Sequence, residues 1–275
     1  MEAFLDCIAC TVTQGLRTAR YSSDDPEVQE RVMRGILAEF AGADLALTPV
    51  ELGHIALKVA ARETGVADPY RDVRIRSNAD ALRLYPRLKD IVRASDGPLQ
   101  TATRIAIAGN IIDFGAVGED FDVEATVERV LKRPFARDDF GRFAEAVNGA
   151  ESVLYLADNA GEIVFDRVLM EEMPGRRLTV AVKAEPFIND AMLADAQQVG
   201  LGEVAAIIEA PIYPGSNEAL ARAWREADLI ISKGQANYEA YNEAEGPLFF
   251  LVLAKCDFVG LSVGVAKGEM MLLAR

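Results

Sequence analysis

The strongest constraint on the fold is a change of pattern near residue 150. From there on, short apolar runs alternate with stretches long enough to form helices. This alternation is typical of βαβ units and a parallel sheet, in which the carboxyl ends of the strands share one edge and ligands bind there. We predict strands at five apolar runs: Ser152–Ala157, Leu178–Lys183, Val204–Ile208, Leu229–Ser232 and Phe258–Val265.

The chain before residue 150 has the period of helices instead. Apolar residues recur every three or four positions in segments 26–43 and 48–65, and Thr48 is placed to cap the second of them. A third helical segment, residues 77–95, contains Pro86, which we expect to interrupt or bend the helix. We find no strand pattern in this half of the chain.

Composition supports a chain that folds on its own. Of its 275 residues, 51% are hydrophobic, which is enough for a core of one large domain or two modest ones. From the change of pattern we predict a mostly helical subdomain over residues 1–145 and an α/β subdomain over residues 146–275.

The charge and the hydropathy pattern narrow the partners. A formal net charge of −14 disfavours binding to nucleic acid or to an anionic membrane, because both attract a basic surface. The apolar runs, even the longest near Leu248–Ala254, are shorter than the ~20 residues that span a bilayer. No basic and then apolar leader opens the chain, and three cysteines do not form a disulfide framework, so we expect a cytoplasmic protein. The oligomeric state stays open.

Candidate ion-binding residues follow three of the predicted strands closely. Asp158 and Asn159 follow the first, Asp190 follows the second and Lys233 follows the fourth. Two carboxylates and an amide supply hard oxygen ligands, which suit Mg²⁺ or Mn²⁺ better than a Cys/His set would. Gly161 would let the backbone approach a ligand where the next helix begins, and such a terminus favours an anion.

Metal, lysine and helix terminus together describe a phosphate site. Each piece alone is weak evidence, since Asp-Asn after a strand is more often a turn or a helix cap than a metal ligand. Their repeated placement at strand ends supports the site, because independent turns would not need complementary charges.

Several segments, in the same order along the chain, resemble one known family. These are "GNIIDFG" (109–115), "LADNAGEIVFDRVL", "INDA" and "SKGQANYE", with "DCIAC" and "DPY" before them and "AKCDFVG" after them. They are similar to the metal-dependent damage-control phosphatases, also labelled acidic-residue methyltransferase-like proteins and long catalogued as a domain of unknown function. The resemblance runs nearly end to end, and the N-terminal CxxC is similar to that of the smaller archaeal and bacterial branch.

The resemblance implies a fold and an activity. A helical N-terminal part would pack on a mostly parallel, Rossmann-like three-layer α/β part, with a divalent metal in a cleft at the strand ends. The implied reaction is hydrolysis of small phosphomonoesters with Mn²⁺, Co²⁺, Ni²⁺ or Mg²⁺. Sugar phosphates and damaged or overflow phosphometabolites are the implied substrates.

The resemblance also implies roles for individual residues. Asp158, Asn159 and Asp190 would hold the metal, and Lys233 would contact the phosphate; these four are the candidate catalytic residues. The candidate substrate contacts are Asn110, Asp113, Ala160, Gly161, Glu162, Asn237 and Glu239. We favour attack by water over a phospho-enzyme, although these residues do not decide between the two.

Two other functions stay open at this point. The family's second label suggests an S-adenosylmethionine-dependent carboxyl methyltransferase, although "ADNAGE" is a poor match to the glycine-rich loop expected there. The other is a non-catalytic, metal-dependent phospholigand-binding protein. A single histidine argues against His-dependent nucleophilic catalysis. Cys7 and Cys10 could serve a redox or metal role or be buried thiols.

Overall fold

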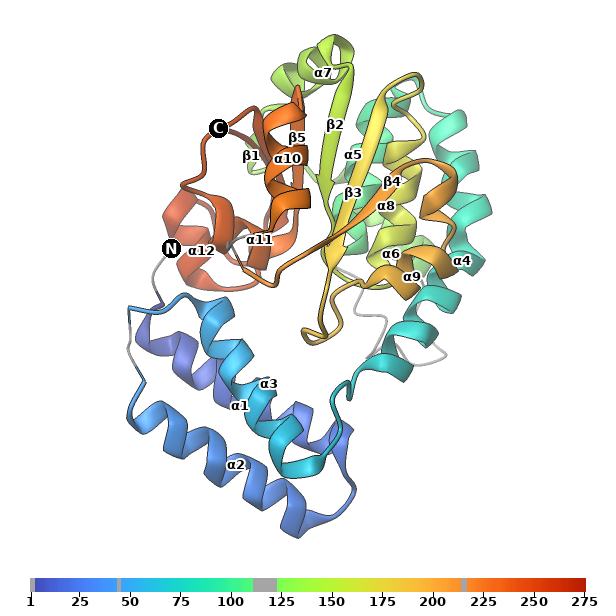
Figure 1. The fold of residues 1–275 in the computed structure, drawn as a ribbon. Coiled ribbons are helices and arrows are strands. Elements are labelled where there is room, and N and C mark those ends of the chain that lie inside the picture. Colours follow the sequence, from blue (N-terminus) through green and yellow to red (C-terminus); the bar gives the residue numbers. More distant parts are fainter. Residues whose placement is uncertain (1–2, 44–45, 111–122, 214–216) are drawn as a thin grey trace.

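The fold is built on a mixed sheet. The computed structural model describes residues 3–43, 46–110, 123–213 and 217–275, of which 123–127 are described by their backbone alone. These residues form a seven-stranded sheet in the order β1-β7-β6-β5-β2-β3-β4 (Figure 1). Neighbouring strands run parallel except β6 and β7, which are antiparallel. The strands are β1 (Arg137–Asp138), β2 (Ser152–Leu156), β3 (Arg177–Lys183), β4 (Ala206–Ala210), β5 (Leu229–Lys233), β6 (Leu248–Leu253) and β7 (Met270–Ala274).

The helices occupy three places around this sheet. Helices α1, α2 and α3 lie beyond the carboxyl edge of its strands, α4, α5 and α8 cover one face, and α10 and α11 pack on the other face (Figure 1). The helices are α1 (Leu5–Ser22), α2 (Pro26–Ala41), α3 (Pro49–Thr64), α4 (Arg71–Arg93), α5 (Pro98–Gly109), α6 (Val123–Lys132), α7 (Phe140–Gly149), α8 (Glu162–Met170), α9 (Leu193–Gln198), α10 (Glu218–Glu226), α11 (Gly234–Tyr241) and α12 (Asp257–Val263), with a 3₁₀ turn at Leu201–Glu203.

The predicted α/β architecture with helices before it is confirmed. Strands β2, β3 and β5 lie where the apolar runs predicted them, and β4 lies two residues later than expected. Thr48 caps α3 and accepts a hydrogen bond from the amide of Glu51. The interruption expected at Pro86 is wrong, because α4 continues through it.

The C-terminal segment was predicted least well. Residues 258–265, expected to form a strand, lie mostly in helix α12, which ends at Gly264 in the left-handed conformation (φ 74°). Burial explains the error, because Leu261 is exposed while Val259 is buried. The apolar segment buries only one side, as a surface helix does, and not both faces, as a central strand would. The sheet instead gains β6, β7 and the short β1, none of which was predicted.

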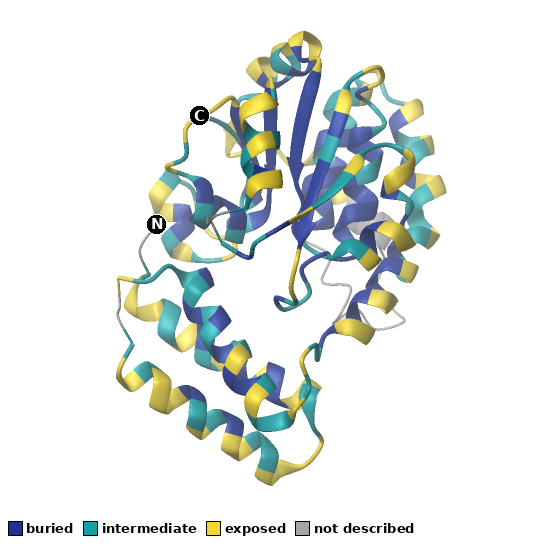
Figure 2. Cartoon of the chain, in the orientation of Figure 1, coloured by how far each residue is buried: buried dark blue, intermediate teal, exposed yellow. Residues whose placement is uncertain are grey.

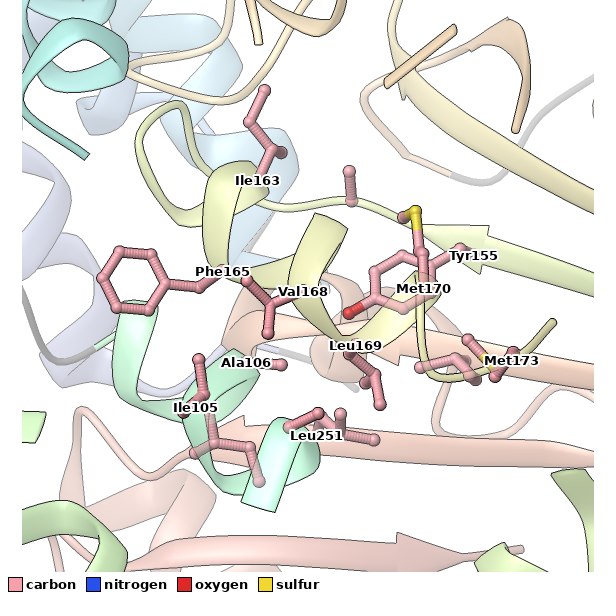
Figure 3. Close-up of a cluster of buried hydrophobic side chains, with 14 of the residues drawn as sticks. Ile105, Ala106, Tyr155, Ile163, Phe165, Val168, Leu169, Met170, Met173 and Leu251 are labelled. Atoms are coloured by element: carbon pink, nitrogen blue, oxygen red, sulfur yellow. The ribbon is translucent and has the colours of Figure 1, made fainter. Parts of the chain in front are cut away.

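The sheet separates two hydrophobic cores. Along β2, Val153 and Tyr155 point into the core under α4, α5 and α8, whereas Leu154 and Leu156 point into the core that includes α10 and α11. This is the period of two that a strand with both faces covered requires. Strand β2 is buried along its whole length, whereas the edge strand β4 has exposed residues (Figure 2). Figure 3 shows where side chains of α5, α8, β2 and β6 meet.

A smaller core belongs to helices α1, α2 and α3 alone. It contains Ala19, Val32, Ile36, Ala56, Val59 and Ala60. Helices α4 and α5 contribute instead to the core of the sheet, through residues such as Leu88 and Ile105. The boundary expected near residue 145 therefore lies inside one continuous core, and we propose to place it between α3 and α4. None of the described helices is long and apolar enough to cross a membrane.

A satellite cluster joins the small helical unit to the sheet. Val50 of α3 packs with Phe187 from the loop after β3 and with Ile212 from the loop after β4. The backbone of Gly53 lies so close to Phe187 that an added Cβ would meet the ring at 3.2 Å. The helical unit is thus held against the edge of the sheet where the predicted ligands lie.

Candidate active site

Backbone hydrogen bonds fasten the loop after β2 to the loop after β3. The amide of Ala191 donates to the carbonyl of Asp158 (2.8 Å), and the amide of Ala160 donates to the carbonyl of Asn189 (2.9 Å). Asn159 and Asp190 form an isolated antiparallel bridge. Two parallel neighbouring strands end side by side, so residues about 30 positions apart in sequence become adjacent.

A cavity of about 520 Å³ opens at this edge. Its wall combines the two loops, the start of α11, the end of β6 and one helix of the N-terminal unit. The lining residues are Gln14, Arg17, Gly109, Asn110, Asp158, Asn159, Ala160, Phe187, Ile188, Asn189, Asp190, Gln235, Ala236, Glu239, Leu253 and Lys255. Three of the four candidate catalytic residues, Asp158, Asn159 and Asp190, therefore line one cavity.

Amide groups hold the Asp158 carboxylate from two sides. Its Oδ2 accepts from Nδ2 of Asn110 (2.8 Å) and from Nδ2 of Asn159 (2.7 Å). Both amides also donate to Oε2 of Glu162, at 2.7 and 3.0 Å. The donors fix the orientation of Asp158 and Asn159 before any ligand is present, which is the preorganisation that a binding site needs.

The charge of the two aspartates is only partly compensated. Burial, reinforced by the neighbouring charge of Asp158, raises the pKa of Asp190 to about 8. Burial and the charge of Glu162 raise the pKa of Asp158 as well. Among the described residues, Oδ2 of Asp190 is buried without a hydrogen bond, and its ion pair with Lys183 spans 3.8 Å. Oδ1 of Asn110 likewise has no hydrogen-bond partner in the described part of the chain.

These atoms fit a hard divalent cation. Buried carboxylates normally have an ionic partner, and an oxygen without one is where a cation would gain most. Among the described residues no three His, Cys, Asp or Glu side chains converge as a metal-binding group. A divalent ion here would combine two carboxylates with an amide oxygen and leave further positions for phosphate and water, which suits Mg²⁺ or Mn²⁺.

Lys233 does not line the cavity. Its side chain is fully buried, and its Nζ donates to Oε1 of Glu162 (2.5 Å), to Oδ1 of Asp166 (2.5 Å) and to the carbonyl of Ala106 (2.9 Å). Burial disfavours the ammonium, but the two carboxylates outweigh it and raise the pKa of Lys233 above its usual range. The phosphate contact expected of Lys233 is therefore replaced by a contact with Glu162, whose other oxygen holds Asn110 and Asn159.

The expected backbone cradle is occupied as well. The amide of Ala160 donates to Asn189, and the amide of Gly161 donates to Oδ1 of Asn78 (2.7 Å). Gly161 has φ 77°, a left-handed conformation that glycine adopts without strain. Glu162 is buried behind Asp158 rather than exposed to a ligand. These two amides shape the turn and are not free to hold phosphate oxygens.

The remaining candidates divide between wall and support. Glu239 lines the cavity. Asn237 lies behind it, where its Nδ2 donates to the carbonyls of Ala157 (3.0 Å) and Lys233 (2.8 Å) and its Oδ1 accepts from Lys183 (3.1 Å). Asp113 lies outside the described residues.

The cavity is also lined by two exposed cations, which the sequence did not indicate as phosphate ligands. They are Arg17 on α1 and Lys255 just after β6. The positive charge of Lys255 lowers the pKa values of Asp158, Glu162 and Asp190 against the effect of burial, so it faces the carboxylates. The signal for Lys255 was present, because it follows the apolar run 248–253, but that run was not predicted to be a strand.

Gly234 is required by the site itself. It has φ 78°, and a Cβ at this position would overlap the carboxylate of Asp158. The first residue of α11 thus packs directly on the carboxylate, and only glycine leaves room for it.

A buried network supports the turn after β2 from the outside. Asn78 of α4, which accepts the amide of Gly161, donates to Oδ1 of Asp195 (2.9 Å), and Arg74 donates to Oδ2 of the same carboxylate (2.9 Å). Arg74 also forms an ion pair with Asp68. The "DPY" segment and α4 therefore position the turn without entering the cavity.

Comparisons with known proteins identify the family of this chain. The family model described as "Damage-control phosphatase ARMT1-like domain" matches residues 3–271. A protein of Archaeoglobus fulgidus named "Damage-control phosphatase" is 33% identical over 96% of this chain and 96% of its own. A damage-control phosphatase of Pyrococcus horikoshii is 29% identical over 99% of this chain and 98% of its own.

A solved structure is similar over the whole chain. It is the crystal structure of a DUF89 family protein from Pyrococcus horikoshii, with a TM-score of 0.89 and 29% identity, covering 100% of this chain and 99% of that one. The relatives therefore span the same length as this chain and share its fold.

Proposed function

The chain belongs to the damage-control phosphatase ARMT1-like family, and we propose that its reaction takes place in the cavity at the carboxyl edge of the sheet. It is a metal-dependent phosphatase of small phosphomonoesters. Sugar phosphates and damaged or overflow phosphometabolites are the substrate classes we propose.

One observation carries this assignment to the cavity. Asp158, Asn159 and Asp190 are brought together on its wall, and Oδ2 of Asp190 is buried without a hydrogen-bond partner in the described part of the chain. We propose these three residues as the ligands of a divalent ion, with Mn²⁺, Co²⁺, Ni²⁺ and Mg²⁺ as candidates. When bound, such an ion would neutralise charge on the phosphoryl group and lower the pKa of a water.

The protein's own residues would position the substrate. Lys255 and Arg17 line the same cavity as exposed cations, and we assign to them the phosphate contact that the sequence suggested for Lys233. A lysine or arginine binds phosphate oxygens through charge-assisted hydrogen bonds. Lys233 acts from behind, because it holds Glu162, which accepts hydrogen bonds from Asn110 and Asn159.

The test is a phosphatase screen after removal of metal. Protein treated with EDTA and dialysed is expected to release little phosphate from a panel of sugar phosphates and 4-nitrophenyl phosphate. Mn²⁺, Co²⁺, Ni²⁺ and Mg²⁺ are then added separately, and at least one should restore turnover. Calorimetry with the restoring metal alone should show binding to the wild-type chain and weak or no binding to Asp158→Asn.

Two results would contradict the proposal. Metal-loaded protein that hydrolyses no member of the panel would remove the phosphatase assignment, and binding of the esters without turnover would favour the phospholigand-binding alternative. Turnover that survives Asp158→Asn in a folded variant, checked by circular dichroism, would move the reaction away from this cavity.

A further inference from the structure

A second lobe extends the cavity toward the N-terminal helices. It has a volume of about 390 Å³ and adjoins the first lobe, because six residues line both. These shared residues are Gln14, Phe187, Ile188, Gln235, Ala236 and Glu239. Asp158 and Asp190 line the first lobe only, so the second lobe begins where the proposed phosphate position ends.

The walls of the second lobe differ from those of the first. Beyond the shared residues it is formed partly by apolar and sulfur-bearing groups, among them Val50, Cys10 and Phe258. Among the described lining residues the charged ones are Asp6, Asp257 and Glu239, and neither Arg17 nor Lys255 lines this lobe. These carboxylates would disfavour a second phosphate or a carboxylate, whereas an uncharged, partly apolar group would be accommodated.

Glu239 stands at the junction of the two lobes. It is 6% exposed, and Nε2 of Gln235 donates to its Oε1 (2.8 Å). Burial, together with the charge of Asp158 and against the hydrogen bond from Gln235, raises the pKa of Glu239 to about 7. A large share of its carboxyl groups therefore carries a proton near neutral pH, as a general acid requires.

We propose that the second lobe holds the alcohol half of the phosphomonoester, and that Glu239 donates a proton to the ester oxygen as it leaves phosphorus. The inference rests on the proposed function. The bond between phosphorus and the ester oxygen breaks, and that oxygen takes the proton of Glu239. The attacking water gives its hydroxyl to phosphorus, and its remaining proton restores the Glu239 acid. The substrate class is a phosphomonoester with an uncharged, partly apolar alcohol.

The decisive experiment varies the leaving group and the acid together. Benzyl phosphate releases a strongly basic alkoxide that needs a proton, whereas 4-nitrophenyl phosphate releases a stable anion that does not. Glu239→Gln is expected to lower kcat/KM for benzyl phosphate by about 10²- to 10³-fold and for 4-nitrophenyl phosphate by less than about 5-fold. Glu239→Asp should recover part of the benzyl phosphate activity, and Glu243→Gln, at an exposed position just after α11, is the matched control.

The shape and charge of the lobe are tested with two further esters. Wild-type kcat/KM should be higher for benzyl phosphate than for methyl phosphate, which cannot reach the second lobe, and also higher than for 4-carboxybenzyl phosphate. Cys10→Trp adds bulk to the wall of the lobe. It should therefore reduce the ratio of kcat/KM for benzyl phosphate to kcat/KM for methyl phosphate. A methyl or carboxybenzyl ester that matches benzyl phosphate would overturn the assignment of the lobe.

The outcomes separate this inference from the proposed function. Equal losses for benzyl and 4-nitrophenyl phosphate in Glu239→Gln, or no loss for either, would overturn the role of Glu239 while leaving the phosphatase intact. Absence of phosphate release from every ester by the metal-loaded wild type would overturn the function and this inference with it. Thermal melts of each variant show whether the fold is kept.

Discussion

Two groups of buried charges lie at the same edge of the sheet, and they are compensated differently. In the first, which we call the lysine cluster, Lys233 lies 2.5 Å from Glu162 and 2.5 Å from Asp166, and all three side chains are closed off from solvent. In the second, the aspartate pair, Asp158 and Asp190 line a cavity, and the ion pair of Asp190 with Lys183 spans 3.8 Å. The first group has an ammonium within 2.5 Å of each carboxylate, although Oδ2 of Asp166 is buried without a hydrogen-bond partner among the described residues. The second group has no described cation as close to Asp190.

The difference teaches which charges serve the fold and which serve the ligand. A buried ion pair with short contacts is complete, and removing one partner leaves the other uncompensated. A buried carboxylate without a close partner lowers the stability of the fold unless a cation binds to it. Such a carboxylate is therefore expected in a binding site. Glu162 connects the two groups, because one of its oxygens accepts from Lys233 and the other from Asn110 and Asn159.

Breaking the lysine cluster should have the largest effect. Lys233→Met leaves Glu162 and Asp166 buried without their ammonium, and we expect a loss of about 3 to 5 kcal/mol in the free energy of unfolding. Turnover should fall too, since Glu162 no longer holds the amides beside Asp158. Urea denaturation measures the first effect and phosphate release the second.

The matched control for this change is Lys89→Met on α4. Lys89 pairs with Glu171 at 2.6 Å, but its side chain is 22% exposed, so we expect a loss of about 1 kcal/mol or less. Similar losses for the two variants would show that the lysine cluster is not a special element of the fold.

Changing the aspartate pair should separate activity from stability. Asp190→Asn removes a negative charge that would bind the cation, and we expect turnover to fall about 10²- to 10³-fold, or about 3 to 4 kcal/mol. In metal-free buffer the free energy of unfolding should stay equal or rise, because the variant no longer buries an ionisable carboxyl whose pKa is raised to about 8. Mn²⁺ should raise the melting temperature of the wild type more than that of the variant. A loss of stability like that of Lys233→Met would contradict the comparison.

Gly234→Ala tests the contact between α11 and the aspartate pair. The new Cβ combines an unfavourable positive φ with overlap of the Asp158 carboxylate, and we expect a loss of about 2 to 3 kcal/mol in unfolding free energy. Gly264→Ala is the control, because Gly264 has φ 74° with no atom within 4 Å of an added Cβ. It should cost about 1 kcal/mol. Equal losses of unfolding free energy in the two variants would mean that the Asp158 carboxylate moves away from the new Cβ at no cost in stability.

The smallest expected effect belongs to the exposed cation. Lys255→Gln should lower kcat/KM about tenfold, or about 1.4 kcal/mol, with no measurable change in stability, because the side chain is exposed and lines the cavity. Lys267→Gln, an exposed lysine outside the cavity lining, should leave both quantities unchanged. Equal activities of the two variants would remove Lys255 from the phosphate contact.

The sequence was most informative where the signal is local. Apolar runs of four to six residues predicted three strands in place, and residues that follow two of them, Asp158 and Asp190, lie together on the cavity wall. Strand ends can be read from period and polarity alone, and parallel strands then bring those ends to one edge. The wrong prediction of a strand at α12 also comes from relying on a local pattern. A short apolar run does not show by its period whether it forms a strand or a helix.

What the sequence determined by itself is the alternation of strands and helices, the edge at which the ligands meet and the oxygen donors placed there. Only the tertiary structure decided which lysine faces the cavity. Lys233 is the last residue of β5 and Lys255 lies just after β6, yet Lys233 is enclosed by Glu162, Asp166 and the carbonyl of Ala106, while Lys255 remains exposed. The physical reason is that burial and counter-charge depend on partners contributed by other segments, up to 127 residues away in sequence, which no local pattern around either lysine contains.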